Sequence, residues 1–160
     1  MGLLLRTFSL LKGLPVYISE TGKKIGVVSD IQISNEGTIQ SIVVDVKGLF
    51  ERDRHFRIED VISFGLDGMM IKQQSTPYKS NRDGHYLNHH HGLIGQLLYT
   101  TEGEKLGIIE DVYFDEKLGT ILGYEVSEGF FADLSEGKRV INSKTPLQFG
   151  EDIVLIEIDT

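Results

Sequence analysis

An internal repeat constrains this sequence more than any other feature. The stretch GKKIGVVSDI at residues 22–31 returns as GEKLGIIEDV at residues 103–112, 81 positions later. The match continues beyond these stretches, since Thr38 corresponds to Thr120 at an interval of 82. Repetition at a fixed interval indicates one structural unit used more than once. We therefore expect two tandem copies of a small domain to account for almost the whole chain of 160 residues.

The residue pattern within each copy is that of β-strands. Apolar residues at every second position predict one buried side for a long strand, namely Ile25, Val27, Ile31 and Ile33 in the first copy and Leu106, Ile108, Val112 and Phe114 in the second. Turn sequences follow, and the segments 39–46 and 121–126 predict the second strand of a hairpin. Short strands separated by glycine predict an all-β fold of five or six strands per copy, in a small barrel or sandwich.

A polar segment lies between the two copies. Residues 75–92 contain Pro, Gly, Asn, Ser and His and few apolar side chains, a composition typical of a linker. We expect the first domain to span residues 8–74 and the second to span residues 93–160.

Two ordered motifs in each copy resemble the PRC-barrel domain family. The first motif, GxxhGxVxDh with h apolar, comprises Gly22, Gly26, Val28, Asp30 and Ile31, and in the second copy Gly103, Gly107, Ile109, Asp111 and Val112. The closing motif comprises Phe64, Gly65 and Asp67, and then Phe149, Gly150 and Asp152. The chain resembles a stand-alone bacterial protein of two such barrels. The resemblance implies a six-stranded barrel in each copy and a docking or assembly role without catalytic residues or a cofactor.

That family includes the cytoplasmic domain of the photosynthetic reaction-centre H subunit and the C-terminal domain of a ribosome maturation factor. The sequence departs from both, because it shows neither the membrane helix of the former nor the N-terminal domain of the latter. The resemblance therefore leaves the partner unknown.

Composition excludes several kinds of chemistry. The chain has no cysteine, which rules out disulfides, thiolate nucleophiles, zinc–thiolate sites and iron–sulfur clusters. The net charge of −8 is uneven: residues 1–78 hold nine basic and nine acidic side chains, whereas residues 93–160 hold five basic and fourteen acidic ones. An acidic surface repels nucleic acid and suits a basic partner protein, although such charge can also serve solubility alone.

We expect that the N-terminal residues do not form a targeting segment. Arg6 and Lys12 interrupt the apolar run there, and no small-residue cleavage site follows. No stretch approaches the roughly 20 apolar residues of a membrane span. We expect a cytoplasmic protein.

Equivalent loops carry the best candidates for partner binding. KGLF places Leu49 and Phe50 after the first hairpin, and EGFF places Phe130 and Phe131 after the second. Exposed aromatic residues in loops often mark a surface for a partner or for a second copy of the chain. The alternative is that each loop folds over the open end of its own barrel and closes it.

Asp30 and Asp111 occupy equivalent positions in separate copies. Paired carboxylates can bind a metal or divide acid and base roles, but residues in separate copies need not meet. We expect each to accept backbone hydrogen bonds at a tight turn or strand end.

Four histidines fall near the end of the polar segment. His85, His89, His90 and His91 are metal-ligand candidates, because imidazole binds zinc, nickel and copper. Neighbouring side chains of an extended segment point in opposite directions, and a linker holds no fixed geometry. We expect a solvated segment with no metal and no cofactor.

One short run supports RNA binding. Arg52, Arg54 and Arg57 are interleaved with His55 and Phe56, in a pattern that could pair with phosphates and stack on bases. Neighbouring acidic residues cancel much of this charge, and a strand would send these side chains to different faces.

The sequence shows no phosphate-binding loop, nucleophile elbow or dinucleotide fingerprint. We therefore expect a non-enzymatic protein-interaction module whose acidic second barrel faces a partner protein, with homo-oligomerisation open. The alternative is an RNA- or ribosome-associated maturation factor that uses Arg52, Arg54 and Arg57.

Overall fold

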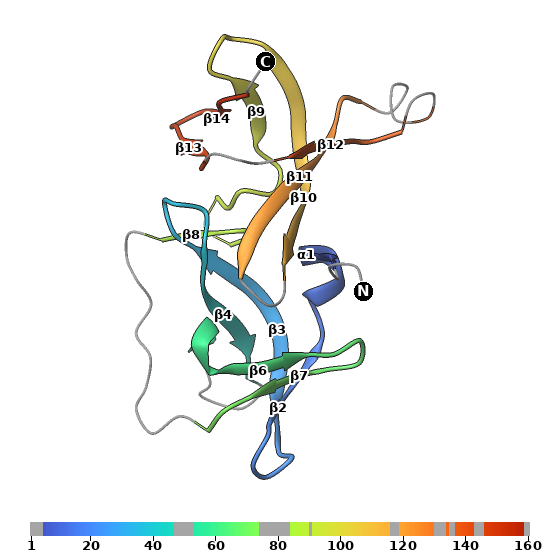
Figure 1. The fold of residues 1–160 in the computed structure, drawn as a ribbon, viewed down its shortest axis with the longest axis vertical. Helices are drawn as coiled ribbons and strands as arrows, with labels where there is room; N and C mark the ends of the chain where they lie inside the picture. The colour runs from blue at the N-terminus through green and yellow to red at the C-terminus, as the bar shows by residue number, and fades with distance from the viewer. Residues whose placement is uncertain are drawn as a thin grey trace.

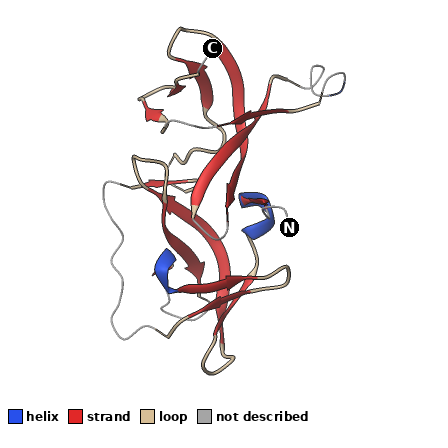
Figure 2. Ribbon diagram, in the orientation of Figure 1, coloured by secondary structure: helices blue, strands red, loops and turns tan. Residues whose placement is uncertain are grey.

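The structure, a computed structural model, describes residues 5–46, 53–73, 84–89, 91–115, 119–129, 134, 137–142 and 146–158. Nearly all of its regular structure is β-strand, which confirms the predicted all-β class (Figure 2). The first half contains β1 (Leu5–Thr7), α1 (Phe8–Leu11), β2 (Pro15–Ile18), β3 (Lys24–Ile33), β4 (Ile39–Asp45), β5 (Arg54–Arg57), the 3-10 helix η1 (Ile58–Asp60), β6 (Val61–Phe64) and β7 (Met69–Ile71). The second contains β8 (His85–Tyr86), β9 (Leu97–Thr100), β10 (Lys105–Asp115), β11 (Thr120–Ser127), β12 (Arg139–Asn142), β13 (Gln148–Phe149) and β14 (Val154–Ile156).

The same six-stranded arrangement occurs twice. The first copy, β2 to β7, has the strand order β5-β4-β3-β2-β7-β6, and the second copy, β9 to β14, has the order β12-β11-β10-β9-β14-β13. In each copy the strand that comes first along the chain lies parallel to the strand that comes last: β2 pairs with β7, and β9 pairs with β14. Two tandem barrel-like units are therefore present, as the repeat predicted.

Bulges in the two long strands change which side chains face the core. The register with the hairpin partner shifts between Val28 and Asp30 in β3 and between Ile109 and Asp111 in β10. Each of these long strands therefore carries one residue more than its partner there. A bulge of this kind moves the residues before it to the opposite face. The predicted core position of Ile108 was therefore wrong: Ile108 is 43% exposed, whereas its neighbour Ile109 is fully buried. In the first copy Val28 likewise replaces Val27 in the core.

The second glycine of the GxxhG motif permits close strand contact. A Cβ atom at Gly26 would collide with the carbonyl oxygen of Asp45, and one at Gly107 would collide with that of Ser127. Both glycines lie where the long strand crosses its hairpin partner, so each copy needs a residue without a side chain there.

Each copy receives a strand from the segment that precedes the other copy. We call residues 5–14 the first leading segment and residues 84–96 the second leading segment. β1, in the first leading segment, pairs with β10 of the second copy, and β8, in the second leading segment, pairs with β3 of the first copy. Figure 1 shows α1 and β8 lying where the two copies meet. This reciprocal exchange makes a seventh strand for each sheet.

The hairpin tips of the two copies also meet. Thr38 and Thr120 form an isolated antiparallel bridge, and the Ile39 N–H donates to the Gly119 carbonyl at 2.9 Å. Buried side chains of both copies and both leading segments form one continuous hydrophobic cluster. The two copies therefore share one hydrophobic core and are not two independently packed domains joined by a linker.

Across the part of the chain that the structure describes, no helix is long and apolar enough to cross a membrane.

Candidate functional site

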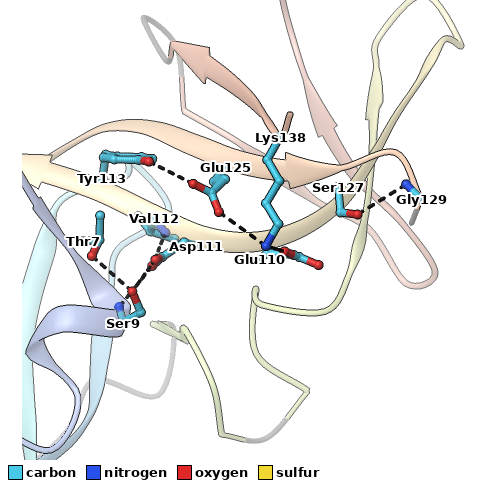
Figure 3. Close-up of polar contacts among 10 residues, drawn as sticks. All are labelled: Thr7, Ser9, Glu110, Asp111, Val112, Tyr113, Glu125, Ser127, Gly129 and Lys138. Carbon is cyan, nitrogen blue, oxygen red and sulfur yellow. Dashed lines mark hydrogen bonds and ion pairs between the residues drawn. The ribbon is translucent and has the colours of Figure 1, made fainter. Parts of the chain in front are cut away.

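Asp111 anchors the first leading segment to the second copy (Figure 3). Its Oδ1 accepts hydrogen bonds from the Val112 N–H at 2.9 Å and the Ser9 N–H at 3.1 Å, and its Oδ2 accepts one from the Ser9 hydroxyl at 2.5 Å. The residue is 8% exposed. Hydrogen bonds to a buried carboxylate are among the stronger ones in proteins, so this contact fixes where the leading segment lies.

Asp30 does the same for the other segment. Its Oδ1 accepts hydrogen bonds from the Ile31 N–H at 2.8 Å and the Asn88 N–H at 3.0 Å, and its Oδ2 accepts one from the His89 N–H at 2.7 Å. The predicted role of both aspartates as backbone acceptors is therefore confirmed. The predicted location was wrong, because both residues lie within long strands next to a bulge and not at a turn.

The outer side of the first copy is covered by the second leading segment. Val43 pairs with Asp30 and with His55, so these three side chains lie on the same side of the sheet. Above them, the Tyr86 hydroxyl hydrogen-bonds the His55 Nε2 at 3.0 Å, with the rings in an edge-to-face contact. Val43 is only 1% exposed as a result. We call this side the first outer face.

Among the described residues, none covers the equivalent side of the second copy in this way. Glu125 stands at the position of Val43, because it pairs with Asp111 and with Val140, the equivalents of Asp30 and His55. Thr7 occupies the position of Tyr86, opposite Tyr113 of β10. A threonine cannot reach across as a tyrosine does, and Val140 is 52% exposed. We call this side, formed by β10, β11 and β12, the second outer face.

Charged residues flank the exposed apolar side chains of the second outer face. The Lys138 Nζ lies 2.5 Å from Glu110 and 3.8 Å from Glu125 (Figure 3). Arg139 pairs with Val126 and so starts from the opposite side of the sheet, where it lies 3.4 Å from Glu128. Large apolar side chains are exposed on or beside this face, namely Leu10, Ile108 and Val140. An apolar patch rimmed by polar residues is one form that protein-binding surfaces take.

Tyr113 adds a hydroxyl to the same face. Its hydroxyl donates to Glu125 at 2.9 Å, and this bond, followed by partial burial and the nearby carboxylates, raises the pKa of Tyr113. The phenol is therefore a neutral donor at physiological pH, and it holds the Glu125 carboxylate in place.

Several residues singled out in the sequence lie outside the described residues. They are Leu49, Phe50, Arg52, His90, Phe130 and Phe131. The described strands on either side are equivalent in the two copies: β4 and β5 flank the first of these loops, and β11 and β12 flank the second.

The remaining arginines of the RNA hypothesis lie on β5. The Arg54 guanidinium sits 5.2 Å from the centre of the Phe56 ring, and the Arg57 Nε lies 3.5 Å from Asp60. Phe56 is 2% exposed, so its ring packs in the core and cannot stack on a base. RNA binding stays a prediction that would depend on the arginines alone.

The histidines that the structure describes hold different positions and do not converge. His89 lies 3.4 Å from Asp30, His91 is exposed, and the His85 Nε2 lies 2.6 Å from the Asn35 Oδ1. Burial lowers the pKa of both His55 and His85, and in His55 the nearby carboxylates of Asp53 and Asp30 act against this effect. Within the described ranges, no three His, Asp or Glu side chains are grouped to hold a metal.

Two six-stranded units with exchanged leading segments and paired glycine motifs define a tandem protein of small β-barrels. The chain belongs to the PRC-barrel domain family, which matches residues 6–75 and 88–160. It is also 32% identical over 138 residues to the uncharacterized protein YrrD of Bacillus subtilis (strain 168), an alignment that covers 86% of this chain and 78% of that protein. These matches confirm the resemblance noted in the two motifs.

Sequence reasoning missed the residues of the exchange, above all Ser9 and Tyr86. A signal for them was present upstream of each copy. Leu11 and Gly13 correspond to Leu93 and Gly95 at the interval of 82, so the repeat begins before the predicted first strand. Extending the comparison upstream would have marked both leading segments as structured.

Proposed function

We propose that this chain is a non-enzymatic docking module whose second outer face binds a basic partner protein. The observation that carries this proposal is the difference between equivalent surfaces. Tyr86 and His55 cover the first outer face, whereas Val140 and Glu125 leave the second one open. In the described residues, one sheet thus has a cover supplied by its own chain, and the other has room for a cover supplied by a partner.

The chemistry of this face favours a basic partner. Two carboxylates of this face, Glu110 and Glu125, share the single cation Lys138. A partner that brings Lys or Arg could exchange these exposed ion pairs for its own at little cost, since exposed pairs contribute little stability. Its apolar side chains would bury Val140 and Ile108, and that burial would supply affinity while the charges steer association.

The aromatic loops extend this proposal. Phe130 and Phe131 belong to the segment that connects β11 and β12, the two strands that carry Glu125 and Val140. We include them in the docking surface of the second copy. Leu49 and Phe50 would form the corresponding contact of the first copy.

Site-specific photo-crosslinking in the native host tests the proposal. A photoreactive phenylalanine analogue replaces Val140, and the matched control places it at Ile62 of β6, an apolar residue that is 58% exposed and remote from this face in sheet order. We expect one saturable protein adduct at position 140, absent at position 62 and lost in Glu110→Lys/Glu125→Lys. Equal adducts at both positions, or RNA in place of protein, would overturn the proposal.

A further inference from the structure

An open groove lies between the second leading segment and the β13–β14 hairpin. It has a volume of about 890 Å³. His85 and Phe149 form part of its wall, and the exposed residues Glu151 and Asp152 lie along it. The second outer face belongs to β10, β11 and β12, at the other end of the strand order, so the groove is a separate surface.

The same place in the first copy is filled by an arginine. The Arg6 guanidinium donates to the Phe64 carbonyl at 2.7 Å and to the Gly65 carbonyl at 3.3 Å, and the side chain is only 6% exposed. Phe64 and Gly65 begin the closing motif of the first copy, and Phe149 and Gly150 begin that of the second. A planar guanidinium with several donors is well suited to two neighbouring carbonyl oxygens.

The strand register shows that His85 replaces Arg6 in the second copy. Arg6 lies opposite Phe114 on β10, and His85 lies opposite Ile33 on β3. Phe114 and Ile33 are equivalent residues at the interval of 81. The exchanged strands therefore present Arg6 to one closing motif and His85 to the other.

His85 does not do what Arg6 does. Its ring stacks on Phe149, with centroids 3.6 Å apart and planes 8° from parallel, and its Nε2 is engaged with Asn35 of the first copy. The imidazole is too short to place donors as a guanidinium does at the end of three methylene groups. The second leading segment also contains three more residues than the first between the equivalents of Ser9 and Leu11. Both differences leave the groove open.

We propose that this groove binds the guanidinium of an arginine side chain from a partner protein. The first copy shows the chemistry that the closing motif accepts when its own chain supplies it. In the second copy a partner's arginine would meet the same backbone, the carboxylates of Glu151 and Asp152, and the stacked rings of His85 and Phe149. Lysine would gain less, because its ammonium group neither forms a planar fork nor stacks.

This inference goes beyond the docking proposal and does not depend on it. A partner could bind the second outer face without using the groove, and the groove could take an arginine even if that face binds nothing. Small probes therefore test the groove directly, without knowledge of the partner.

The experiment is an NMR titration of the ¹⁵N-labelled full chain with three probes. They are N-acetyl-arginine-methylamide, its lysine analogue, and the capped tripeptide Gly-Arg-Gly. We expect saturable shifts at the amides of Gly150 and Asp152 with the arginine probe, at least about fivefold weaker binding of the lysine probe, and tripeptide binding no weaker than that of the arginine probe.

Two variants complete the design. His85→Arg should fill the groove with the chain's own guanidinium and abolish the shifts. Asp152→Asn should weaken binding about threefold or more, whereas its equivalent in the first copy, Asp67→Asn, should leave binding unchanged. If His85→Arg does not fold, the comparison of Asp152→Asn with Asp67→Asn still shows whether the arginine probe binds in the groove.

The inference fails if no saturable shifts occur up to about 20 mM of the arginine probe. If the lysine probe binds as tightly as the arginine probe, the groove does not select a guanidinium group. If Asp152→Asn and Asp67→Asn weaken binding equally, the probe does not bind in this groove. If the small arginine probe binds but the tripeptide does not, the ligand is not an arginine side chain of a partner protein. The result would indicate a free guanidinium compound instead.

Discussion

Thr38 and Thr120 hold the same place in the two copies and pair with each other. Equivalent residues meet in this way only near a two-fold axis, the geometry of symmetric dimers. The exchanged leading segments follow the same relation, with Ser9 bound to Asp111 and Asn88 bound to Asp30. The chain is therefore arranged as a dimer of barrels within one polypeptide.

Removing the Ser9 hydroxyl should loosen the first leading segment. Ser9→Ala leaves Asp111 with two N–H donors and deletes the hydrogen bond to its Oδ2. We expect the free energy of unfolding, measured in urea, to fall by about 1–2 kcal/mol. The control Ser127→Ala, at a half-buried serine whose hydroxyl accepts an exposed hydrogen bond from the Gly129 N–H at 3.3 Å, should cost less than about 0.5 kcal/mol. A loss no larger than that of the control would count against the anchoring role of Asp111.

Arg6 should matter through the shape of its guanidinium as well as its charge. Arg6→Lys keeps the charge but loses the two-carbonyl contact with Phe64 and Gly65, and we expect unfolding to become easier by about 1–3 kcal/mol. Urea, not guanidinium chloride, is the denaturant for this measurement. Millimolar guanidinium should restore part of the loss in Arg6→Ala but not in Ser9→Ala. Equal restoration in both variants would show a general salt effect.

We predict that the stability of the folded chain decreases in mild acid because of His55 and His85. Burial lowers the pKa of His55 and His85 in the folded chain below the ordinary 6.5. As the pH falls below about 6.5, the unfolded chain takes up protons that the folded chain does not, so the free energy of unfolding decreases. The urea midpoint should therefore fall between pH 7.5 and 6.0, and His55→Gln/His85→Gln should flatten this dependence. An unchanged slope in the double variant would assign the effect to other groups.

The ion pairs of the second outer face should contribute little to folding. Lys138 is 44% exposed and its partner Glu110 is 37% exposed, so water screens their attraction. We expect Lys138→Ala to change the free energy of unfolding by less than about 1 kcal/mol, and a double-mutant cycle with Glu110→Ala to give a coupling of similar size. A larger coupling would mean that the face is built for stability and not for exchange with a partner.

The sequence was sufficient to predict the fold class and the repeat, because both depend on local signals. Gly26 and Gly107 report a close strand crossing, and the segments around Ile42 and Tyr124 have the composition of strands. Asp30 and Asp111 were also predicted as backbone acceptors, because aspartate commonly accepts such bonds at turns and strand ends, although their place next to a bulge was not foreseen. These features appear twice, and repetition made each of them visible.

The strand exchange and the bulges could not be predicted in the same way. Which sheet edge receives β1 or β8 depends on contacts across nearly the whole chain, such as Ser9 with Asp111. An extra residue in β10 leaves no mark in composition, so alternation along the sequence placed Ile108 in the core instead of Ile109. The open second outer face follows from the exchange, because it depends on Thr7 standing where the first copy has Tyr86.

The most direct test of this account is whether the two copies unfold as one unit. The chain has no tryptophan, so Tyr17→Trp and Tyr99→Trp would each give a single fluorescent probe at equivalent positions of the two copies. A shared core and reciprocal exchange predict that the two variants, once corrected for their own stability by circular dichroism, show coincident urea transitions. Separate transitions, with one copy unfolding while the other stays intact, would contradict the account.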